Sequence, residues 1–469
     1  MLYGFSDRGG TLVVCPSISF PAEALRKIVG IQHYEERLLF FVLLLRDPRL
    51  RLVYITSVAI DEAIVDYYLS FLPDPEGARD RLELIAVGDD APSALSAKVL
   101  DRPWLIQRLR ESTSGSDDAF LVPFNVTSWE SELAEYLDIP LFGPQPGLNP
   151  LGSKSGSRRV ARLAGVPVFD GAEDLWSLDE VEQAAKELLA RHPAAGAIVV
   201  KLNNGFSGQG NAIVDAHRIR SPIATSETVF CAEEESWSSF AAKVVAEGAI
   251  VEELARKPGA VSPSVQMTIA PGGRMEIVST HDQILGGPDG QVYLGCRFPA
   301  RPPYRFLIQD NACNVARILA SKGVIGSFGV DFIVWEQDGR HRANLTEINL
   351  RMGGTTHPYL MTKLATEGRY DAPSGELIAA GRSKAYVATD NLKSDAFVGL
   401  TPGDVIDAVA GKGLGYDHDL RKGVTLHLLG ALERFGKMGI TCIADSPEEA
   451  DALYEEVVAA LAELATSRT

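Results

Sequence analysis

The stretch Glu347-Ile348-Asn349-Leu350-Arg351 alternates polar side chains with apolar ones. Alternate side chains of an extended strand point to the same face, so a carboxylate, an amide and a guanidinium would share one face of this strand. A similar run, G-V-D-F-I-V at residues 329–334, contains Asp331, and a turn-like segment at residues 336–340 separates the two runs. We therefore predict an antiparallel hairpin that brings Asp331 beside Glu347 and Asn349.

This hairpin would present two carboxylates and an amide oxygen together. These are hard oxygen ligands, of the type that Mg²⁺ takes alongside nucleotide phosphates. Asp331, Glu347 and Asn349 are therefore candidate metal ligands. The alternative interpretation of the segment alone is a polar strand face turned to solvent.

Size and charge limit the classes of function. A chain of 469 residues suggests roughly three domains, at about 150 residues for each. The net charge of −17 argues against a nucleic-acid partner, because the phosphate backbone would be repelled. Local basic sites can still bind a small phosphorylated molecule.

The cysteines and the apolar segments indicate a cytoplasmic protein without a membrane partner. Five cysteines are scattered with no C-x-x-C pair and no metal-site spacing, which is typical of a reducing compartment. The longest apolar run, Leu38 to Leu45, is far shorter than the roughly 20 residues of a membrane helix. It predicts a helix buried against a sheet. The N-terminus lacks the features of a signal peptide.

The first 140 or so residues alternate strand and helix signals, which favours a doubly wound parallel sheet. We expect strands at residues 11–15, 52–56, 82–87 and 120–122, and helices at 21–46, 60–72, 103–111 and 128–137. Residues 142–150 are rich in Gly and Pro and predict a linker. Beyond Lys154 the pattern changes to short strands punctuated by glycine pairs, which favours antiparallel pairing.

A phosphate-binding loop is the next candidate. Lys201 ends the apolar strand 197–202, and Gly205, Gly208 and Gly210 follow it. Glycines let the main chain approach phosphate oxygens closely, and the lysine supplies a cation. The order of lysine and glycines is not that of a Walker A loop or of a dinucleotide fingerprint. The alternative is a Gly-rich hairpin without a ligand.

Two further segments are ordinary when taken alone. Glu252, Glu253 and Leu254 end an apolar strand, and such a strand end usually lies at the surface. Lys154 begins a predicted helix after Gly152-Ser153, where a solvated lysine is the default.

The order of these segments resembles the ATP-grasp superfamily of carboxylate–amine and carboxylate–thiol ligases, over residues 154–351. The resemblance implies that Lys154 and Lys201 hold the phosphates of ATP. It also implies that Arg351 lies near the reacting carboxylate or the γ-phosphate. Further roles are implied for a phosphate-covering loop, an adenine-binding strand end and ligands of two Mg²⁺ ions. These residues are Gly205, Ser207, Gly208 and Gly210; Glu252, Glu253 and Leu254; and Asp331, Glu347 and Asn349.

A closer resemblance is to the pheganomycin-type peptide ligases of actinobacteria. It is carried by F-G-P at 142–144, G-S-K-S-G-S-R at 152–158, K-L-N-N-G-F-S-G-Q-G-N-A at 201–212 and E-I-N-L-R-M-G-G-T-T-H-P at 347–358. The implied architecture is an N-terminal α/β domain (1–148) and an ATP-grasp fold with an antiparallel central sheet. That fold would comprise a lid region (149–248), a central catalytic region (249–380) and a C-terminal extension packed on it (381–469).

The catalytic residues remain open at several positions. Many ATP-grasp ligases have an arginine two residues before the first metal acid, whereas this chain has Gly329 there. Arg297 and Arg351 are the alternatives for the missing charge. His357, just after two glycines and two threonines, is a candidate contact to the substrate or a plain turn residue. His281 and Asp282 are weaker candidates for the same cleft.

The function implied is an ATP-dependent peptide ligase for natural-product biosynthesis. It would join the carboxylate of an amino acid to the amine of a peptide or amino acid through an acyl phosphate, releasing ADP and phosphate. Its partners would be a small-molecule acyl donor and the nucleophile, with a homodimer as a further implication of the resemblance. The alternatives are a kinase that stops after phosphoryl transfer and a nucleotide-binding scaffold without turnover.

Overall fold

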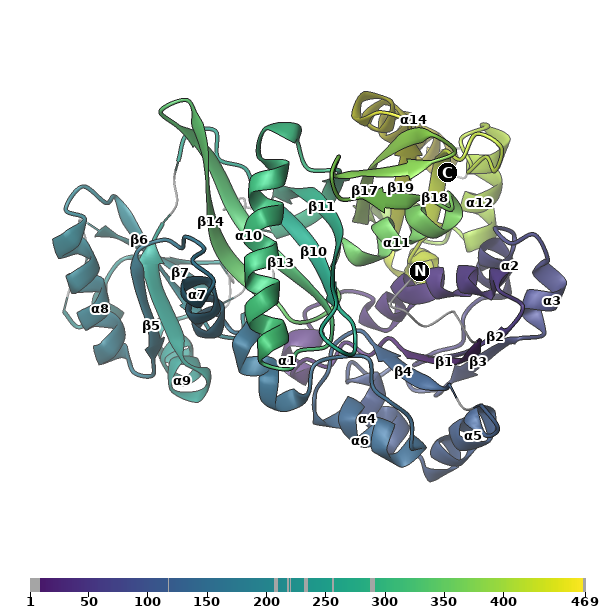
Figure 1. Ribbon diagram of the computed structural model, residues 1–469, viewed down its shortest axis with the longest axis horizontal. Helices are drawn as coiled ribbons and strands as arrows, with labels where there is room; N and C mark the ends of the chain where they lie inside the picture. Colours follow the sequence, from purple (N-terminus) through teal and green to yellow (C-terminus); the bar gives the residue numbers. More distant parts are fainter. Residues whose placement is uncertain are drawn as a thin grey trace.

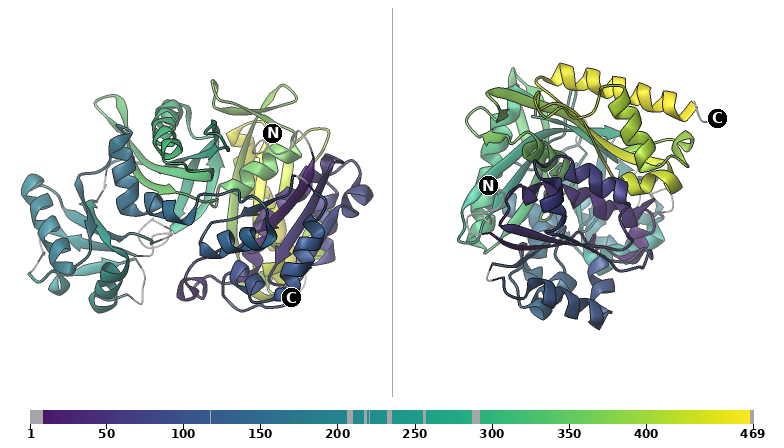
Figure 2. Two further views of the ribbon diagram at one scale, coloured as in Figure 1. Left: turned by 60° about the horizontal axis from the view of Figure 1, so that its bottom comes forward. Right: turned by 90° about the vertical axis from the view of Figure 1, so that its right-hand side faces the viewer.

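The computed structural model describes residues 9–116, 118–205, 210–216, 219, 221–231, 235–254, 257–286 and 292–466. Three β-sheets organise these residues. A small sheet lies at one end of an elongated molecule, a large sheet lies in the middle, and the N- and C-terminal parts lie together at the other end (Figures 1 and 2). The predicted mixed α/β architecture, with a parallel N-terminal sheet and an antiparallel central sheet, is confirmed.

The N-terminal sheet is parallel and is covered on both faces. Its strands run in the order β3-β2-β1-β4. The strands are β1 (Gly10–Cys15), β2 (Leu50–Thr56), β3 (Leu82–Ala86) and β4 (Phe120–Pro123). Within β1, Leu12 and Val14 belong to one apolar cluster while Val13 and Cys15 belong to another. Burial on both faces explains the continuous apolar runs that made these strands recognisable.

The helices of this part are short. They are α1 (Ala22–Leu25), α2 (Glu62–Leu69), α3 (Pro75–Arg79), α4 (Leu95–Leu100), α5 (Pro103–Thr113) and α6 (Ser128–Leu137). Helix α6 begins after Thr127, because that hydroxyl and Glu130 form a reciprocal capping box. The helix expected over residues 21–46 is instead α1 followed by a 3₁₀ helix, η1 (Ile31–Arg46). The apolar run within η1 is buried, as predicted.

The small sheet is antiparallel, with strand order β5-β9-β6-β7-β8. Its strands are β5 (Gly171–Leu175), β6 (Ala197–Leu202), β7 (Asn211–Asp215), β8 (Thr228–Phe230) and β9 (Ala249–Glu253). Helices α8 (Leu178–Arg191) and α9 (Trp237–Glu247) and the short η4 (Ile223–Thr225) accompany it. This sheet has an apolar core of its own.

The large sheet contains ten antiparallel strands. Its main path is β14 (Arg340–Asn349), β13 (Gly326–Gln337), β10 (Pro263–Ile269), β11 (Met275–Gly286), β12 (Val292–Phe298), β17 (Arg382–Lys393), β16 (Glu376–Ala379) and β15 (Arg369–Asp371). Strand β19 (Lys437–Ala444) pairs with β17 and with β18 (Gly423–His427). Helices α7 (Lys154–Leu163) and α10 (Pro302–Ser321) bury the apolar face formed by β10, β13 and β14.

The remaining helices connect the sheets and cover their edges. They are η2 (Pro146–Gly152), α11 (Thr356–Ala365), η5 (Asp395–Phe397), α12 (Pro402–Gly411), η6 (Leu429–Ala431), α13 (Leu432–Phe435) and α14 (Pro447–Thr466). None of the helices in the described part of the chain has both the length and the apolar character needed to span a membrane. All five cysteines lie in that part and carry free thiols.

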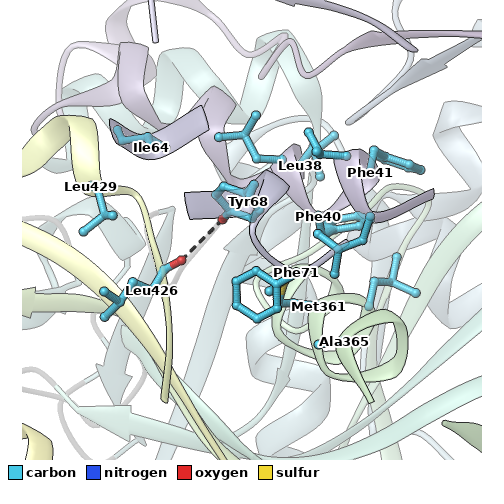
Figure 3. Close-up of a cluster of buried hydrophobic side chains, with 14 of the residues drawn as sticks. Leu38, Phe40, Phe41, Ile64, Tyr68, Phe71, Met361, Ala365, Leu426 and Leu429 are labelled. Atoms are coloured by element: carbon cyan, nitrogen blue, oxygen red, sulfur yellow. Dashed lines mark hydrogen bonds between the residues drawn. The ribbon is translucent and has the colours of Figure 1, made fainter. Parts of the chain in front are cut away.

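The N-terminal and C-terminal parts share one hydrophobic core. Figure 3 shows Leu38, Phe40 and Phe41 of η1 beside Tyr68 of α2, Met361 of α11 and side chains near β18. The Tyr68 hydroxyl donates a hydrogen bond to the carbonyl oxygen of Leu426 at 3.4 Å. The C-terminal extension therefore packs on the N-terminal domain as well as on the central sheet.

We predict that the free energy of unfolding falls below pH 6.5 through the buried His281. Its Nε2 lies 2.6 Å from the Tyr386 hydroxyl, and burial lowers the pKa of its ring to about 3. Between these two pH values the unfolded chain binds a proton that the folded chain does not. Stability should therefore fall by up to about 1.4 kcal/mol for each pH unit. His281→Gln should remove this contribution.

Urea unfolding at pH 7 and pH 5 measures the effect as a difference between variant and parent. His418→Gln, at an exposed position, is the matched control and should keep the parental pH dependence. An unchanged slope in His281→Gln would contradict the prediction.

Candidate active site

The predicted hairpin forms with the expected register. Strands β13 and β14 are antiparallel, Asp331 lies opposite Glu347, and Gly329 lies opposite Asn349. The amide of Asn349 donates to Asp331 Oδ2 at 3.0 Å. Opposed residues of a sheet share a face, so the two carboxylates and the amide form one polar row.

The Asp331 carboxylate is confined on several sides. Gln283 Nε2, on β11, donates to its Oδ1 at 3.0 Å. Burial and the adjacent Glu347 carboxylate raise the pKa of Asp331 to about 7, against the opposing charges of Arg351 and Lys154. Two like charges directly opposite each other in a sheet are unfavourable, so a cation between them would be stabilising.

Arg351 lies just beyond the end of β14 and turns back toward the same row. Its Nη2 donates to Asn349 Oδ1 at 3.0 Å, and its Nη1 donates to the Met352 carbonyl at 3.0 Å. The guanidinium carbon lies 5.8 Å from the centre of the Phe20 ring. Burial lowers the pKa of Arg351, while Glu347 and Asp331 oppose that effect. The guanidinium is thus fixed beside the carboxylates.

Lys154, the first residue of α7, reaches the hairpin from the other side. Its ammonium forms an ion pair with Glu347 and lies 3.4 Å from the carbonyl oxygen of Gly205. Ser153 caps α7 by accepting from the Gly156 N–H, which orients the first turn toward β14. The lysine is buried, so its charge is available to a ligand only within the site.

Lys201, on β6, joins a second ion-pair group in the small sheet. Its ammonium lies 2.5 Å from Glu252 Oε1, and Arg158 Nη1 donates to Glu252 Oε2 at 2.9 Å. Arg158 also bonds Glu173 at 3.1 Å. Glu252 is therefore satisfied by two cations. The neighbouring Glu253 points to the other face of β9 and pairs with Lys257, and Leu254 is half-buried at the strand end.

The glycine loop begins in a fixed conformation. Asn203 Oδ1 accepts from the Ser155 N–H at 2.9 Å, and Asn203 Nδ2 donates to the Glu247 carbonyl at 2.9 Å. Gly210 has φ +88°, a conformation that favours glycine. Gly205 and Gly210 border the described parts of the loop, whereas the predicted Ser207 and Gly208 lie outside the described residues.

Two cavities meet at the polar row. One, of about 660 Å³, is lined by Gly205 and Gly210 of the glycine loop, by α9 and by the residues that follow β1 and β4. The other, of about 370 Å³, is lined by Gln283, Asp331 and the glycines after Arg351, and by side chains of the N-terminal domain. Phe20, Glu347, Asn349 and Arg351 border both cavities.

Gly329 now has a structural explanation. A Cβ atom at this position would lie 2.9 Å from Gln266 Nε2, which belongs to the opposed residue of β10. Gln266 lines the smaller cavity together with Gly329. The side chain of Gln266 therefore occupies the space above Gly329, and Arg351 is the guanidinium found beside Asp331.

Arg297 lies elsewhere. Its exposed guanidinium bonds Asp451 of α14 at 3.0 Å, and it is not among the described residues that line the two cavities. Glu252, Glu253 and Leu254 are likewise not among these lining residues.

The candidate histidines are covered by protein. His357 Nε2 lies 2.8 Å from His427 Nε2, and burial together with His427 and Arg37 lowers the pKa of His357 well below its usual value. His281 lies opposite Ser264, in the same row as Asp331, but Tyr359 and Tyr386 pack against it. Asp282 accepts from the Tyr304 hydroxyl at 2.7 Å.

Several residues around the row were missed by sequence reasoning. Gln283, Arg37 and Asp390 come from three distant strands or helices, and all of them line the smaller cavity. Gln283 follows His281 by two positions on β11, so strand alternation could have found it once His281 was placed on that face. Arg37 and Asp390 are 353 positions apart, and local patterns hold no signal for that contact.

The chain matches two family models. One, described as "IQCH-like, ATP-grasp", matches residues 149–229 and 224–372. The other, described as "PGM1 C-terminal domain", matches residues 404–457. Together they include the residues of the hairpin and much of the C-terminal extension.

Two relatives are similar in sequence. An L-propargylglycine–L-glutamate ligase of Streptantibioticus cattleyicolor is 32% identical over 461 residues, which cover 96% of this chain and 93% of that enzyme. The IQ motif-containing protein H of Danio rerio is 21% identical over 401 residues, covering 73% of this chain and 37% of that protein.

Solved structures share the fold. The biotin carboxylase of Campylobacter jejuni has a TM-score of 0.57 and 14% identity, covering 94% of this chain and 89% of that one. The N5-carboxyaminoimidazole synthetase of Staphylococcus aureus has a TM-score of 0.54 and 12% identity, covering 96% and 97%. With the hairpin, the small sheet and the relative that matches over nearly its full length, these findings show that the chain belongs to the ATP-grasp ligases, enzymes that form carbon–nitrogen bonds.

Proposed function

We propose that this chain joins the carboxylate of an amino acid to the amine of a peptide or another amino acid, through an acyl phosphate and with release of ADP and phosphate. The observation that supports it best is the position of Glu347, Asn349 and Arg351 at the border of two cavities. A phosphoryl donor under the glycine loop and a carboxylate in the smaller cavity would meet at this border.

ATP would bind where the small sheet faces the hairpin. Lys154 and Lys201 would be the cations for its phosphates, the loop that Gly205 and Gly210 border would cover them, and the strand end at Glu252, Glu253 and Leu254 would lie near adenine. In the structure both lysines are paired with carboxylates, Glu347 and Glu252. These ion pairs keep the buried charges neutralised until phosphate oxygens replace the carboxylates.

Magnesium fits the polar row. Asp331, Glu347 and Asn349 would hold two ions, with phosphate oxygens and water completing the coordination. No group of three His, Cys, Asp or Glu side chains is arranged as a metal site in the described ranges, so the protein side of this site would be two carboxylates and an amide. The crowding of Asp331 and Glu347 supports this fit. When bound, the ions would neutralise charge on the β- and γ-phosphates.

The reaction would proceed in two steps. A carboxylate oxygen bonds to the γ-phosphorus and the bond to the ADP oxygen breaks, with Arg351 beside the developing charge. The amine nitrogen then bonds to the acyl carbon, the carbon–oxygen bond to phosphate breaks, and the amine loses a proton. Positioning supplies most of the acceleration, so a side-chain nucleophile is not needed.

The substrate class is supported by relatedness. The Streptantibioticus relative is named as a ligase of two amino acids. We infer an amino-acid donor for this chain and a role in making a small natural product. A kinase would stop at the acyl phosphate, and a scaffold would not turn over ATP.

Glu347→Gln should reduce ADP release by at least about 100-fold, because it removes a metal-binding charge at the site of phosphoryl transfer. The fold should be retained, since the change removes one of two opposed carboxylates and the glutamine oxygen can still accept a hydrogen bond from Lys154. A coupled ADP assay with Mg²⁺, ATP and a panel of amino acids and peptides measures the rate, and thermal unfolding monitors the fold. Glu336→Gln, at the exposed end of β13, is the matched control and should keep parental activity. Parental activity in Glu347→Gln would refute the metal assignment.

Hydroxylamine detects the acyl phosphate, and an added amine separates the ligase from the kinase. With ATP and a donor amino acid, hydroxylamine should trap the acyl phosphate as a hydroxamate in the absence of a natural amine. Addition of the correct amine should yield an amide, identified by mass spectrometry of the products. A stable phosphorylated product that never gives an amide with any amine would favour the kinase alternative.

A further inference from the structure

The smaller cavity ends in a buried ion pair that the proposed chemistry does not use. Arg37 of η1 and Asp390 of β17 pair at 3.3 Å between Nη1 and Oδ2, and both line the cavity. Asp390 is only 8% exposed. The pair thus joins the N-terminal domain and the C-terminal extension at the wall of the cavity.

One oxygen of this carboxylate is left available. Among the described residues, Asp390 Oδ2 accepts from Arg37 and no hydrogen bond to Oδ1 is found, while the Asp390 charge also acts on Lys437 and His427. A buried carboxylate normally has its oxygens hydrogen-bonded, because an unsatisfied buried charge is costly. A single hydrogen bond at 3.3 Å is a weak bond for a purely structural ion pair. The remaining oxygen suits a donor that enters the cavity.

Arg37 is held in place independently of Asp390. Its guanidinium carbon lies 4.7 Å from the Tyr34 ring centre and 5.0 Å from that of Phe124. Its Nε donates to the Tyr34 carbonyl at 3.4 Å, and the Tyr34 hydroxyl accepts from Lys437 at 2.6 Å. The acceptor position of Asp390 is therefore preorganised before a ligand arrives.

A cation and an anion lie at different places on the wall of the smaller cavity. Arg351 borders it at the polar row, Asp390 is an anion elsewhere on its wall, and Phe20, Ile28 and Leu285 supply apolar surface. Arg37 is near enough to Arg351 to lower the pKa of that guanidinium. A molecule that carries a carboxylate and an ammonium group on a short carbon frame matches this arrangement.

We propose that Asp390 binds the α-ammonium group of the amino acid whose carboxylate is activated, and that Arg37 positions Asp390. This inference rests on the proposed ligase function and adds a requirement, a free amine on the acyl donor. An N–H of the ammonium group donates to Asp390 Oδ1 while Arg37 keeps Oδ2. The alternative is that the ion pair serves only to clamp the two ends of the chain together.

The test compares amino acids with acids that lack the amine. L-Norvaline and pentanoate, L-glutamate and glutarate, and L-phenylalanine and phenylpropanoate are supplied with ATP, Mg²⁺ and hydroxylamine, and kcat/KM for ADP release is measured. The parent should prefer an amino acid over its amine-free partner by at least about 100-fold, the value of a buried charged hydrogen bond. Asp390→Asn should reduce this preference below about tenfold.

Two further variants keep the result interpretable. Asp390→Glu retains the charge and should keep the preference at a lower kcat/KM. Asp395→Asn, at an exposed position five residues further on, is the matched control and should behave as the parent. A purely structural ion pair would lower stability and all rates together, and would leave the preference ratio unchanged.

The outcomes separate the two proposals. ADP release with a preference that disappears in Asp390→Asn supports the inference. ADP release with an unaltered preference in Asp390→Asn overturns the inference and leaves the ligase function standing. No ADP release by the parent with any donor or amine overturns the ligase function, and the inference with it.

Discussion

The site depends on two carboxylates that face each other across one strand pair. Asp331 and Glu347 are directly opposed on β13 and β14, which like charges disfavour. The surrounding fold compensates: Lys154 pairs with Glu347, Asn349 and Gln283 donate to Asp331, and Arg351 lies alongside. The start of α7, strand β11 and the end of β14 all contribute side chains to this row, because the opposed carboxylates need cations and hydrogen-bond donors there.

The need to neutralise buried charges also explains the ion pairs in the small sheet and at the hairpin of the large sheet. Lys201 and Arg158 neutralise Glu252 in the small sheet, as Lys154 neutralises Glu347 at the hairpin. Buried charges without partners would destabilise each sheet by several kcal/mol, on the order of 3–5 for a broken pair. Under the proposed function, phosphate oxygens and their metal ions would take the place of the carboxylates in these pairs.

Local periodicity predicted the parts of the site that lie on single elements. The alternation in residues 347–351 predicted the hairpin face, and the apolar strand before Lys201 predicted β6, because both are patterns of period two. The same reasoning missed the 3₁₀ character of residues 31–46. It could not find the Arg37–Asp390 contact, which exists only because η1 and β17 meet in a shared core. The sequence also could not predict that Arg297 lies outside the site, because its partner Asp451 belongs to the last helix.

The shared core also bears on why the two ends of the chain stay together. Residues from η1, α2 and α11 and from the strands near the C-terminus bury their apolar side chains in one cluster, so separating the ends would expose all of it. The smaller cavity lies between elements that this cluster fixes, with Phe20 and Arg37 from one end and Asp390 from the other. Because both ends of the chain line this cavity, substitutions of these lining residues can alter its shape without altering the hairpin. Under the proposed function, the polar row would fix the chemistry, and the surface contributed by the two ends would select the substrate.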